Sequence, residues 1–331
     1  MSEILSQSAL RALAAEWIAG GKSVAGPVRV KPDLILYRAL QSADKLLLDG
    51  FQRPANSIKE FVFPKAEKLY GYKIRGNTIE LTDNDAPPTT TVILAARPCD
   101  AAALPILDHV FNWDFPDEFY NRRRTATTVV TLVCSAHDEN CFCTSVGLSP
   151  AAERGSDAIL YKLGDGLYEV RCITEKGRAL FSGKTQKSER TAEATAGPEK
   201  KFDPQTVRGF VSQHFSDPFW EEHALTCIGC GTCAFSCPVC HCFDIVDAGP
   251  AAGNMRVRTW DSCQFSMFTA HASGHNPRSV QPSRQRQRIL HKFAIYPEKF
   301  GEILCTGCGN CTRNCPVGLG VLTVASEIRN G

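Results

Sequence analysis

The sequence predicts an α+β protein, with an N-terminal α/β domain and a C-terminal domain that is mostly helical and rich in cysteine. Two short apolar runs, Val92–Ala96 and Val129–Val133, are typical of parallel strands buried on both faces. Residues 183–203 are polar and have little to bury, which predicts a linker. After the linker few strand-like runs remain, and cysteines gather at short spacing. We therefore predict domains at residues 1–182 and 204–331.

The elements of the N-terminal domain follow from residue periodicity. Apolar residues at helical spacing predict an amphipathic helix over residues 4–19, which Gly20 and Gly21 end. Glycine-centred turns predict one hairpin over residues 72–81 and a second over residues 158–173. Residues 101–110 lie between the two apolar runs and predict the helix that connects one strand to the next.

Composition excludes several classes of protein. The 331 residues carry 37 basic and 35 acidic side chains, so the net charge is +2, which disfavours a protein built mainly to bind nucleic acid. No apolar run is long enough to span a bilayer, and the first residues lack a secretory signal. We therefore expect a soluble cytoplasmic protein with no membrane partner. In that reducing compartment, 16 cysteines indicate metal or redox chemistry.

Eight of the cysteines form two matching runs, each with the spacing C-x2-C-x2-C-x3-C followed by proline. The first run contains Cys227, Cys230, Cys233 and Cys237, and the second contains Cys305, Cys308, Cys311 and Cys315. This is the bacterial spacing for paired [4Fe–4S] clusters, in which three cysteines of a run bind one cube and the fourth binds the other. The predicted ligands are Cys227, Cys230, Cys233 and Cys315 for cluster 1, and Cys305, Cys308, Cys311 and Cys237 for cluster 2.

Zinc is the alternative for these thiols, but zinc sites usually pair two C-x2-C motifs or include histidine. The repeated run with its proline favours a ferredoxin-type dicluster domain. The 67 residues from Pro238 to Leu304 separate the runs and suggest a helical insertion, as in the all-helical dicluster modules of iron–sulfur subunits.

Four N-terminal cysteines suggest a third iron–sulfur cluster. Cys99 and Cys134 each follow one of the two apolar strands, so parallel pairing would bring both to one edge of the sheet. Cys141 and Cys143 lie on the next loop and would complete the ligand set, with Arg97 offsetting charge and Asp100 capping a helix. Their spacing matches no standard run, and the alternative is that they are small buried side chains. Cys172, Cys240, Cys242 and Cys263 stay unassigned.

A basic stretch from Arg284 to Lys292 allows several interpretations. A solvated helix face is the default, and a position beside anionic clusters, a docking surface and a nucleic-acid site are the alternatives. His241, between two cysteines, is most simply a packed histidine. No nucleotide-binding fingerprint and no hydrolase or metalloprotease motif occurs, so we expect the chain alone not to be a catalyst.

Several motifs, in order along the chain, carry a resemblance to a known family. They are Arg97-Pro98-Cys99-Asp100, Cys141-Phe142-Cys143-Thr144-Ser145, Cys237-Pro238-Val239-Cys240-His241-Cys242, Trp260-Asp261-Ser262-Cys263 and His275-Asn276-Pro277-Arg278. Over about residues 60–325 the chain resembles the iron–sulfur β subunits of cytoplasmic sulfhydrogenases, the NAD(P)-linked nickel–iron hydrogenases. It is also similar to the iron–sulfur electron-transfer subunits of anaerobic sulfite reductases.

This resemblance implies an electron-relay subunit of a multi-subunit oxidoreductase. FAD and NAD(P) would bind to a partner subunit, and a nickel–iron hydrogenase or a sulfite reductase subunit would catalyse the reaction. Two other functions remain open at this stage. One is sulfur or polysulfide reduction at the N-terminal cysteines, and the other is nucleic-acid processing with structural clusters.

Overall fold

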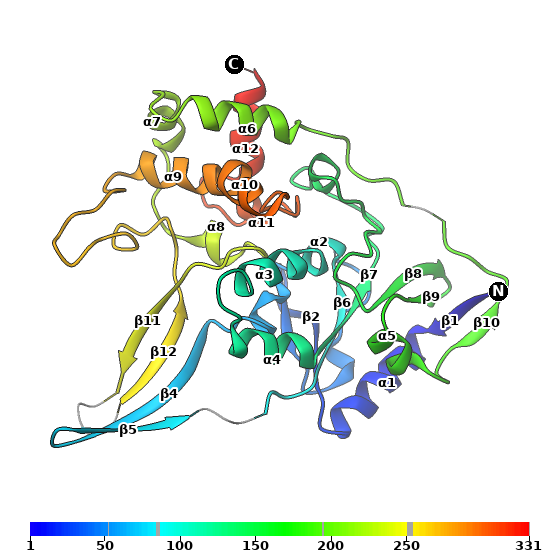
Figure 1. Cartoon of the computed structure of the whole chain (residues 1–331). Coiled ribbons are helices and arrows are strands. Elements are labelled where there is room, and N and C mark those ends of the chain that lie inside the picture. Colours follow the sequence, from blue (N-terminus) through cyan, green and yellow to red (C-terminus); the bar gives the residue numbers. More distant parts are fainter. Residues whose placement is uncertain (52, 84–86, 194, 250–253, 331) are drawn as a thin grey trace.

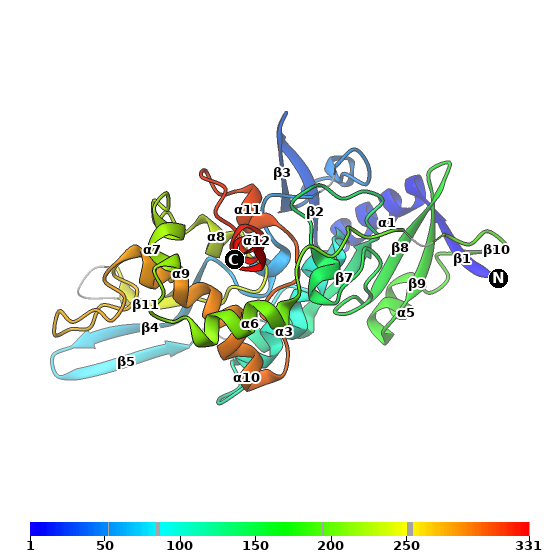
Figure 2. The same ribbon diagram turned by 90° about the horizontal axis from the view of Figure 1, so that it is seen from above.

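The computed structural model describes every residue except 52, 84–86, 194, 250–253 and 331 (Figure 1). A large sheet with helices on both faces forms the N-terminal part, short helices form the C-terminal part, and a second sheet projects from the side. The view from above shows that the tip of this second sheet and the N-terminus lie at opposite ends of the molecule (Figure 2). The predicted α+β fold class is confirmed.

The large sheet has eight strands and mixed direction. In spatial order they are β10 (Gln186–Ser188), β1 (Ser2–Ser6), β9 (Leu167–Cys172), β8 (Ala158–Gly164), β7 (Thr127–Leu132), β6 (Thr91–Ala96), β2 (Ser23–Lys31) and β3 (Leu34–Ala39). The central strands β2, β6, β7 and β8 are parallel, and the outer strands are antiparallel to their neighbours. The two apolar runs of the sequence are thus the adjacent parallel strands β6 and β7, as predicted.

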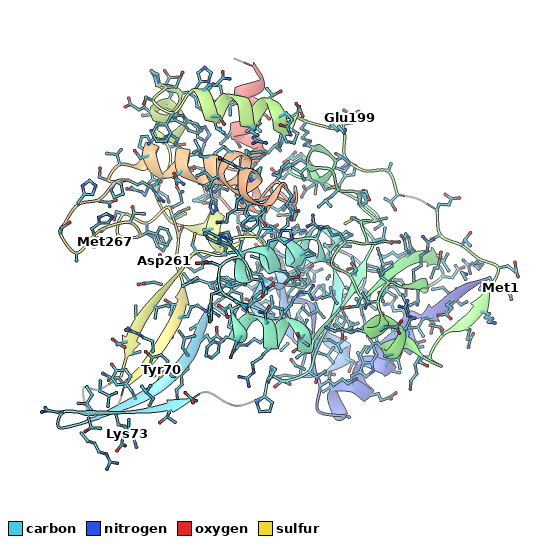
Figure 3. The ribbon with its side chains drawn as sticks, in the orientation of Figure 1. Met1, Tyr70, Lys73, Glu199, Asp261 and Met267 are labelled. Atoms are coloured by element: carbon cyan, nitrogen blue, oxygen red, sulfur yellow. The ribbon has the colours of Figure 1, made fainter. Side chains whose placement is uncertain are left out.

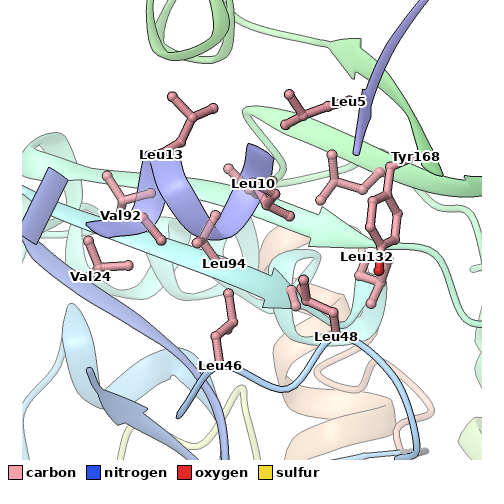
Figure 4. Packing of buried hydrophobic residues seen from close by; sticks show 14 of the residues in the cluster. Leu5, Leu10, Leu13, Val24, Leu46, Leu48, Val92, Leu94, Leu132 and Tyr168 are labelled. Atoms are coloured by element: carbon pink, nitrogen blue, oxygen red, sulfur yellow. The ribbon is translucent and has the colours of Figure 1, made fainter. Parts of the chain in front are cut away.

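Helices on both faces explain why these strands are apolar throughout. Helix α1 (Gln7–Ala19) lies on one face, where Leu10 and Leu13 pack with Val92 and Leu94 of β6 (Figure 4). The intervening Ile93 points to the other face, against α3. The helices of this domain are α2 (Pro98–Ala101), α3 (Ala103–Phe111), α4 (Glu118–Ala126) and α5 (Glu175–Phe181), with 3-10 turns at Ala43–Lys45, Ile58–Phe61 and Cys143–Val146.

The second sheet is a four-stranded antiparallel ribbon made by both halves of the chain. Its spatial order is β11 (Phe243–Ala248), β12 (Asn254–Trp260), β4 (Ala66–Arg75) and β5 (Thr78–Asp83). The hairpin predicted over residues 72–81 is its β4–β5 half. The expectation of an all-helical insertion between the cysteine runs is wrong, because β11 and β12 lie inside that insertion and β12 pairs with β4.

Arg258 forms buried ion pairs both within the ribbon and to the α/β domain. The Arg258 guanidinium of β12 donates to Glu67 of β4 at 2.6 Å, and both side chains are almost completely buried. Arg258 also pairs with Asp117, the N-cap residue of α4. Removing Arg258 would leave the Glu67 charge without this partner, and it would also remove the Asp117 pair that holds the ribbon against α4.

Short helices make up the rest of the C-terminal half. They are α6 (Pro204–Gln213), α7 (Phe219–Ala224), α8 (Thr232–Phe235), α9 (Gln281–Leu290), a π-helical turn (His291–Ile295), α10 (Tyr296–Phe300), α11 (Asn310–Arg313) and α12 (Val321–Asn330). In the range predicted as a linker, residues 186–188 form the edge strand β10, and residue 194 lies outside the described residues. None of the described helices combines the length and the apolar character needed to cross a membrane.

Candidate iron–sulfur centres

The two cysteine runs fold into the same local structure. In each run the second glycine, Gly231 or Gly309, has a φ of 74° and starts a one-turn helix, α8 or α11. The first glycine of each run, Gly229 or Gly307, also has a positive φ. Glycine adopts this left-handed conformation without steric cost, so both loops can curl around a cluster at the same points. The sequence repeat is therefore a structural repeat.

The fourth cysteine of the first run lies among the cysteines of the second. The electrostatic interactions of Cys305 and Cys308 both include Cys237 and Cys311. This is the crossed arrangement that the spacing predicts for cluster 2. Burial raises the pKa of Cys305 to about 11 and that of Cys308 to about 12. Both thiols would therefore be protonated at neutral pH, and binding to iron would deprotonate them.

Several N–H groups donate to sulfur atoms of the two runs. The side-chain amides of Gln281 and Gln285 donate to Cys227 Sγ at 3.1 and 2.9 Å. The backbone amide of Val321 donates to Cys311 Sγ at 3.4 Å. Hydrogen bonds of this kind stabilise cluster thiolates and tune the reduction potential. The residues present therefore fit iron–sulfur clusters.

Buried cations from the basic stretch lie beside these sulfur atoms. Lys292 is 5% exposed, and its Nζ donates to Cys237 Sγ at 3.4 Å. Burial lowers the pKa of Lys292, but the thiols of Cys237 and Cys305 raise it more, so the ammonium stays charged. Arg284 and Arg288 are also buried. For these three side chains the solvated-face interpretation is wrong. Arg288 and Lys292 lie among the cysteine thiols, whereas Arg284 donates to Gln281.

The four N-terminal cysteines line a single cavity. Cys99, Cys134, Cys141 and Cys143 share it with residues of the second cysteine run, Gly307 and Cys308. Cys99 lies in α2 directly after β6, and Cys134 follows the neighbouring strand β7. The register between these strands shifts near Ala95, a non-glycine residue with a φ of 53°. This strained position bends the chain just before Cys99, and such strain is common at functional sites.

Arg53 connects the N-terminal cavity to the second cysteine run. Its guanidinium donates to Cys99 Sγ, to Asp100 Oδ1 at 2.8 Å and to Asn310 Oδ1 at 2.6 Å. Asn310 is the first residue of α11 and stands between two cysteines of the run. Arg53 therefore places a positive charge at the boundary between the two sites.

Two neighbours of Cys99, Arg97 and Asp100, differ in how their predicted roles compare with the structure. Arg97 lines the cavity, where burial raises the pKa of Cys134 and the charge of Arg97 lowers it, while its side chain also donates to the Phe51 carbonyl at 2.7 Å; Arg53 is a second cation and is the one bonded to Cys99. Asp100 does not cap a helix. It lies inside α2, where it accepts from Arg53 and from Tyr37 Oη. Neither contact could be expected from sequence, because Arg53 and Tyr37 are distant along the chain.

Backbone packs directly against backbone between the N-terminal cavity and the second cysteine run. The Phe142 amide donates to the Gly307 carbonyl at 2.9 Å. A Cβ at Gly307 would lie 2.5 Å from the backbone of Cys143, so no other residue fits there. Arg313 of α11 pairs with Asp138 at 2.7 Å across the same boundary. The two candidate sites are therefore immediate neighbours.

Among the described residues, no three Cys, His, Asp or Glu side chains converge closely enough to hold a single metal ion. A four-iron cube needs a wider arrangement than one ion, because each thiolate binds a different corner.

Comparison with known proteins identifies the family. Residues 226–319 match the family described as 4Fe-4S dicluster domain. The whole chain is 30% identical to the sulfhydrogenase 2 subunit beta of Pyrococcus furiosus over 321 residues, which covers 93% of this chain and 92% of that protein. The chain belongs to the sulfhydrogenase β-subunit family. No solved structure matches it.

Membership in this family confirms the resemblance seen in the motifs. Like other sulfhydrogenase-type β subunits, the chain is an iron–sulfur electron-transfer subunit, and its dicluster domain spans both cysteine runs.

Proposed function

We propose that this β subunit passes electrons between a flavin- and NAD(P)-binding subunit and a nickel–iron hydrogenase in a cytoplasmic complex. The observation that carries the proposal is the row of adjoining cysteine sites. Cys233 of the first run interacts with Cys311 of the second, and Cys308 of the second run lines the N-terminal cavity. Sites in contact with each other suit electrons that move in single steps from one cluster to the next.

The proposed ligands are those that the sequence predicts. Cluster 1 binds to Cys227, Cys230, Cys233 and Cys315, cluster 2 to Cys305, Cys308, Cys311 and Cys237, and a third cluster to Cys99, Cys134, Cys141 and Cys143. Bound clusters supply one-electron redox chemistry. The buried cations Lys292 and Arg53 would favour the reduced forms, since an added electron makes a cluster more negative.

One end of this row reaches the surface. Cys230 is exposed, and its neighbour Ile228 is 68% exposed. An exposed apolar side chain beside a cluster ligand suits contact with a partner subunit. We propose that electrons are exchanged with one partner at cluster 1, and that the N-terminal cluster serves the other.

Iron content tests the three clusters. Full-length protein purified without oxygen should hold about twelve irons in these three sites. Replacing both Cys99 and Cys134 with serine should remove about four of them and leave the spectra of clusters 1 and 2 unchanged. Cys172→Ser is the matched control, because Cys172 is another partly buried cysteine of the same domain. Unchanged iron in the double variant would show that the N-terminal thiols hold no cluster.

Purification of the native complex tests the partners. The isolated chain should neither oxidise NAD(P)H nor produce hydrogen, whereas the complex with flavin and nickel–iron subunits should couple the two reactions. Stoichiometric flavin in the isolated chain would overturn the assignment of that cofactor to a partner. A sirohaem subunit in place of the nickel–iron subunit would overturn the hydrogenase assignment in favour of sulfite reduction.

A further inference from the structure

Three cysteines outside both runs line one cavity beside the ribbon. They are Cys240, Cys242 and Cys263, and the cavity is also lined by His241, His291, Arg288 and Lys292. Cys242 is within hydrogen-bonding reach of both Cys240 and Cys263. Neither the dicluster assignment nor the N-terminal site uses these three thiols.

The base of the ribbon brings them together. Cys242 directly precedes β11, and Cys263 follows shortly after β12. Because the two strands are antiparallel, Phe243 pairs with Trp260, and the Asp261 amide donates to the Cys242 carbonyl at 3.0 Å. Figure 3 shows Asp261 at the base of the ribbon, where it meets the helical part, with Tyr70 and Lys73 farther out along it. The convergence of the thiols is thus a result of the hairpin.

The charges around this cavity favour an anionic occupant. Arg288 is 4% exposed, and its guanidinium lies among the thiols of Cys233, Cys311 and Cys263. Lys292 adds a second buried cation. The buried Lys59 contributes a third, since its Nζ donates to the Cys240 carbonyl at 2.8 Å. No carboxylate is among the described residues that line the cavity. A buried cation is costly unless anions lie beside it.

We propose that Cys240, Cys242, Cys263 and His241 hold a fourth iron–sulfur centre. The centre with its thiolates would be a further anion beside Arg288, in addition to the clusters bound by Cys233 and Cys311. His241 is the fourth ligand because its Nδ1 lies 3.1 Å from the Val239 carbonyl. Donation to that carbonyl fixes the tautomer and leaves the Nε2 lone pair free, the arrangement usual for metal-binding histidines. Its ring is in edge contact with His291, which would pack against the ligand.

This centre would lie beside both proposed cubes. Cys233, a ligand of cluster 1, and Cys237, a ligand of cluster 2, line the same cavity. The β subunit would then carry a centre that touches both cubes and stands apart from the row that leads to Cys99. Such a side position suits a centre that stores an electron while its neighbours transfer others.

Removal of the three thiols tests the proposal. The triple variant Cys240→Ser/Cys242→Ser/Cys263→Ser should lose the irons of one cluster, about four per chain for a cube. It should retain the irons lost by the Cys99/Cys134 variant, so this proposal and the N-terminal cluster fail independently. His241→Gln should abolish a nitrogen hyperfine coupling in the reduced protein, and His291→Gln should preserve it. Unchanged iron content, or bound zinc in place of iron, would overturn the proposal.

A measurement on the unaltered protein avoids the risk that the triple variant misfolds. Cys172, Cys240, Cys242 and Cys263 are all partly buried, and the reactivity of each thiol with a small alkylating reagent is compared with its own reactivity after iron chelation. In the full-length protein purified without oxygen, Cys172 should react while the other three are protected. After iron chelation all four should react. Alkylation of Cys242 and Cys263 at the same rate before and after chelation would contradict the fourth centre.

Discussion

In the C-terminal half, three of the four proposed ligands of each cube come from one loop of seven residues. In the N-terminal half, the four candidate cysteines come from three separate segments: helix α2, the end of β7 and the turn at residues 141–146. The first type of site needs only local backbone geometry, chiefly two left-handed glycines per loop. The second type exists only after β6 and β7 have paired in parallel.

This difference predicts how well each site should keep its geometry when another part of the molecule is altered. A loop that carries most of its own ligands can bind a cube with little help from the rest of the fold. A cavity whose walls come from several segments loses its shape when any of them moves. The predictions below test this contrast, from the largest expected effect to the smallest.

The largest effect is expected from Cys237→Ser. Cys237 belongs by sequence to the first run, but its electrostatic partners are Cys305 and Cys308. The variant should therefore lose the cluster of the second run, about four irons per chain, and keep the cluster of its own run. Mössbauer spectroscopy or EPR of the purified protein distinguishes the two. Loss of the first-run cluster alone would mean that the ligands do not cross.

An intermediate effect is expected from Gly309→Ala, which adds a methyl group where the second cysteine loop packs against the N-terminal half. The new Cβ would overlap the carbonyl of Asn140, so the variant should lose about 1–3 kcal/mol of stability from overpacking. Gly318→Ala is a matched control, because Gly318 has nearly the same positive φ but no atom near the added Cβ. Thermal unfolding of the two variants separates backbone strain from overlap. Equal destabilisation by both would remove the argument that the loops are tightly packed together.

The smallest effect is expected from Arg288→Met, measured as a reduction potential. Arg288 is buried among the thiols of Cys233 and Cys311, and its loss should lower the potential of a neighbouring cluster. A shift on the order of 60 mV corresponds to a tenfold change in a one-electron equilibrium. Arg286→Met is the control, since Arg286 is partly exposed and stacks on Phe215 away from the cluster thiols. Redox titrations that give equal shifts for both variants would assign the effect to net charge.

The sequence predicts well what is encoded locally. The helix over residues 4–19 is found as α1 at residues 7–19, and the predicted hairpins and parallel strands are present. The two cysteine runs are recognisable because their spacing is itself the geometry of the loop. Parallel pairing of β6 and β7 also explains why Cys99 and Cys134 line one cavity, as inferred from the two apolar runs.

The features that the sequence does not predict depend on contacts between segments that are far apart along the chain. Strands β11 and β12 lack a clear apolar alternation because β11 is exposed on both faces, so their pattern does not differ from that of a loop. Without that hairpin, Cys242 and Cys263 have no visible reason to meet. Arg53 is likewise an ordinary surface residue in the sequence, and only the fold places it between Cys99 and Asn310.

The contact between Gly307 and Cys143 also affects how the protein is made. The N-terminal cavity takes one wall from residues 307 and 308, which leave the ribosome long after Cys99 and Cys143. A chain that folds during synthesis therefore leaves this cavity open on one side until its C-terminal part arrives. The open side is a route by which a preassembled cluster can enter. Docking of the second cysteine loop would then close the cavity over a cluster bound there.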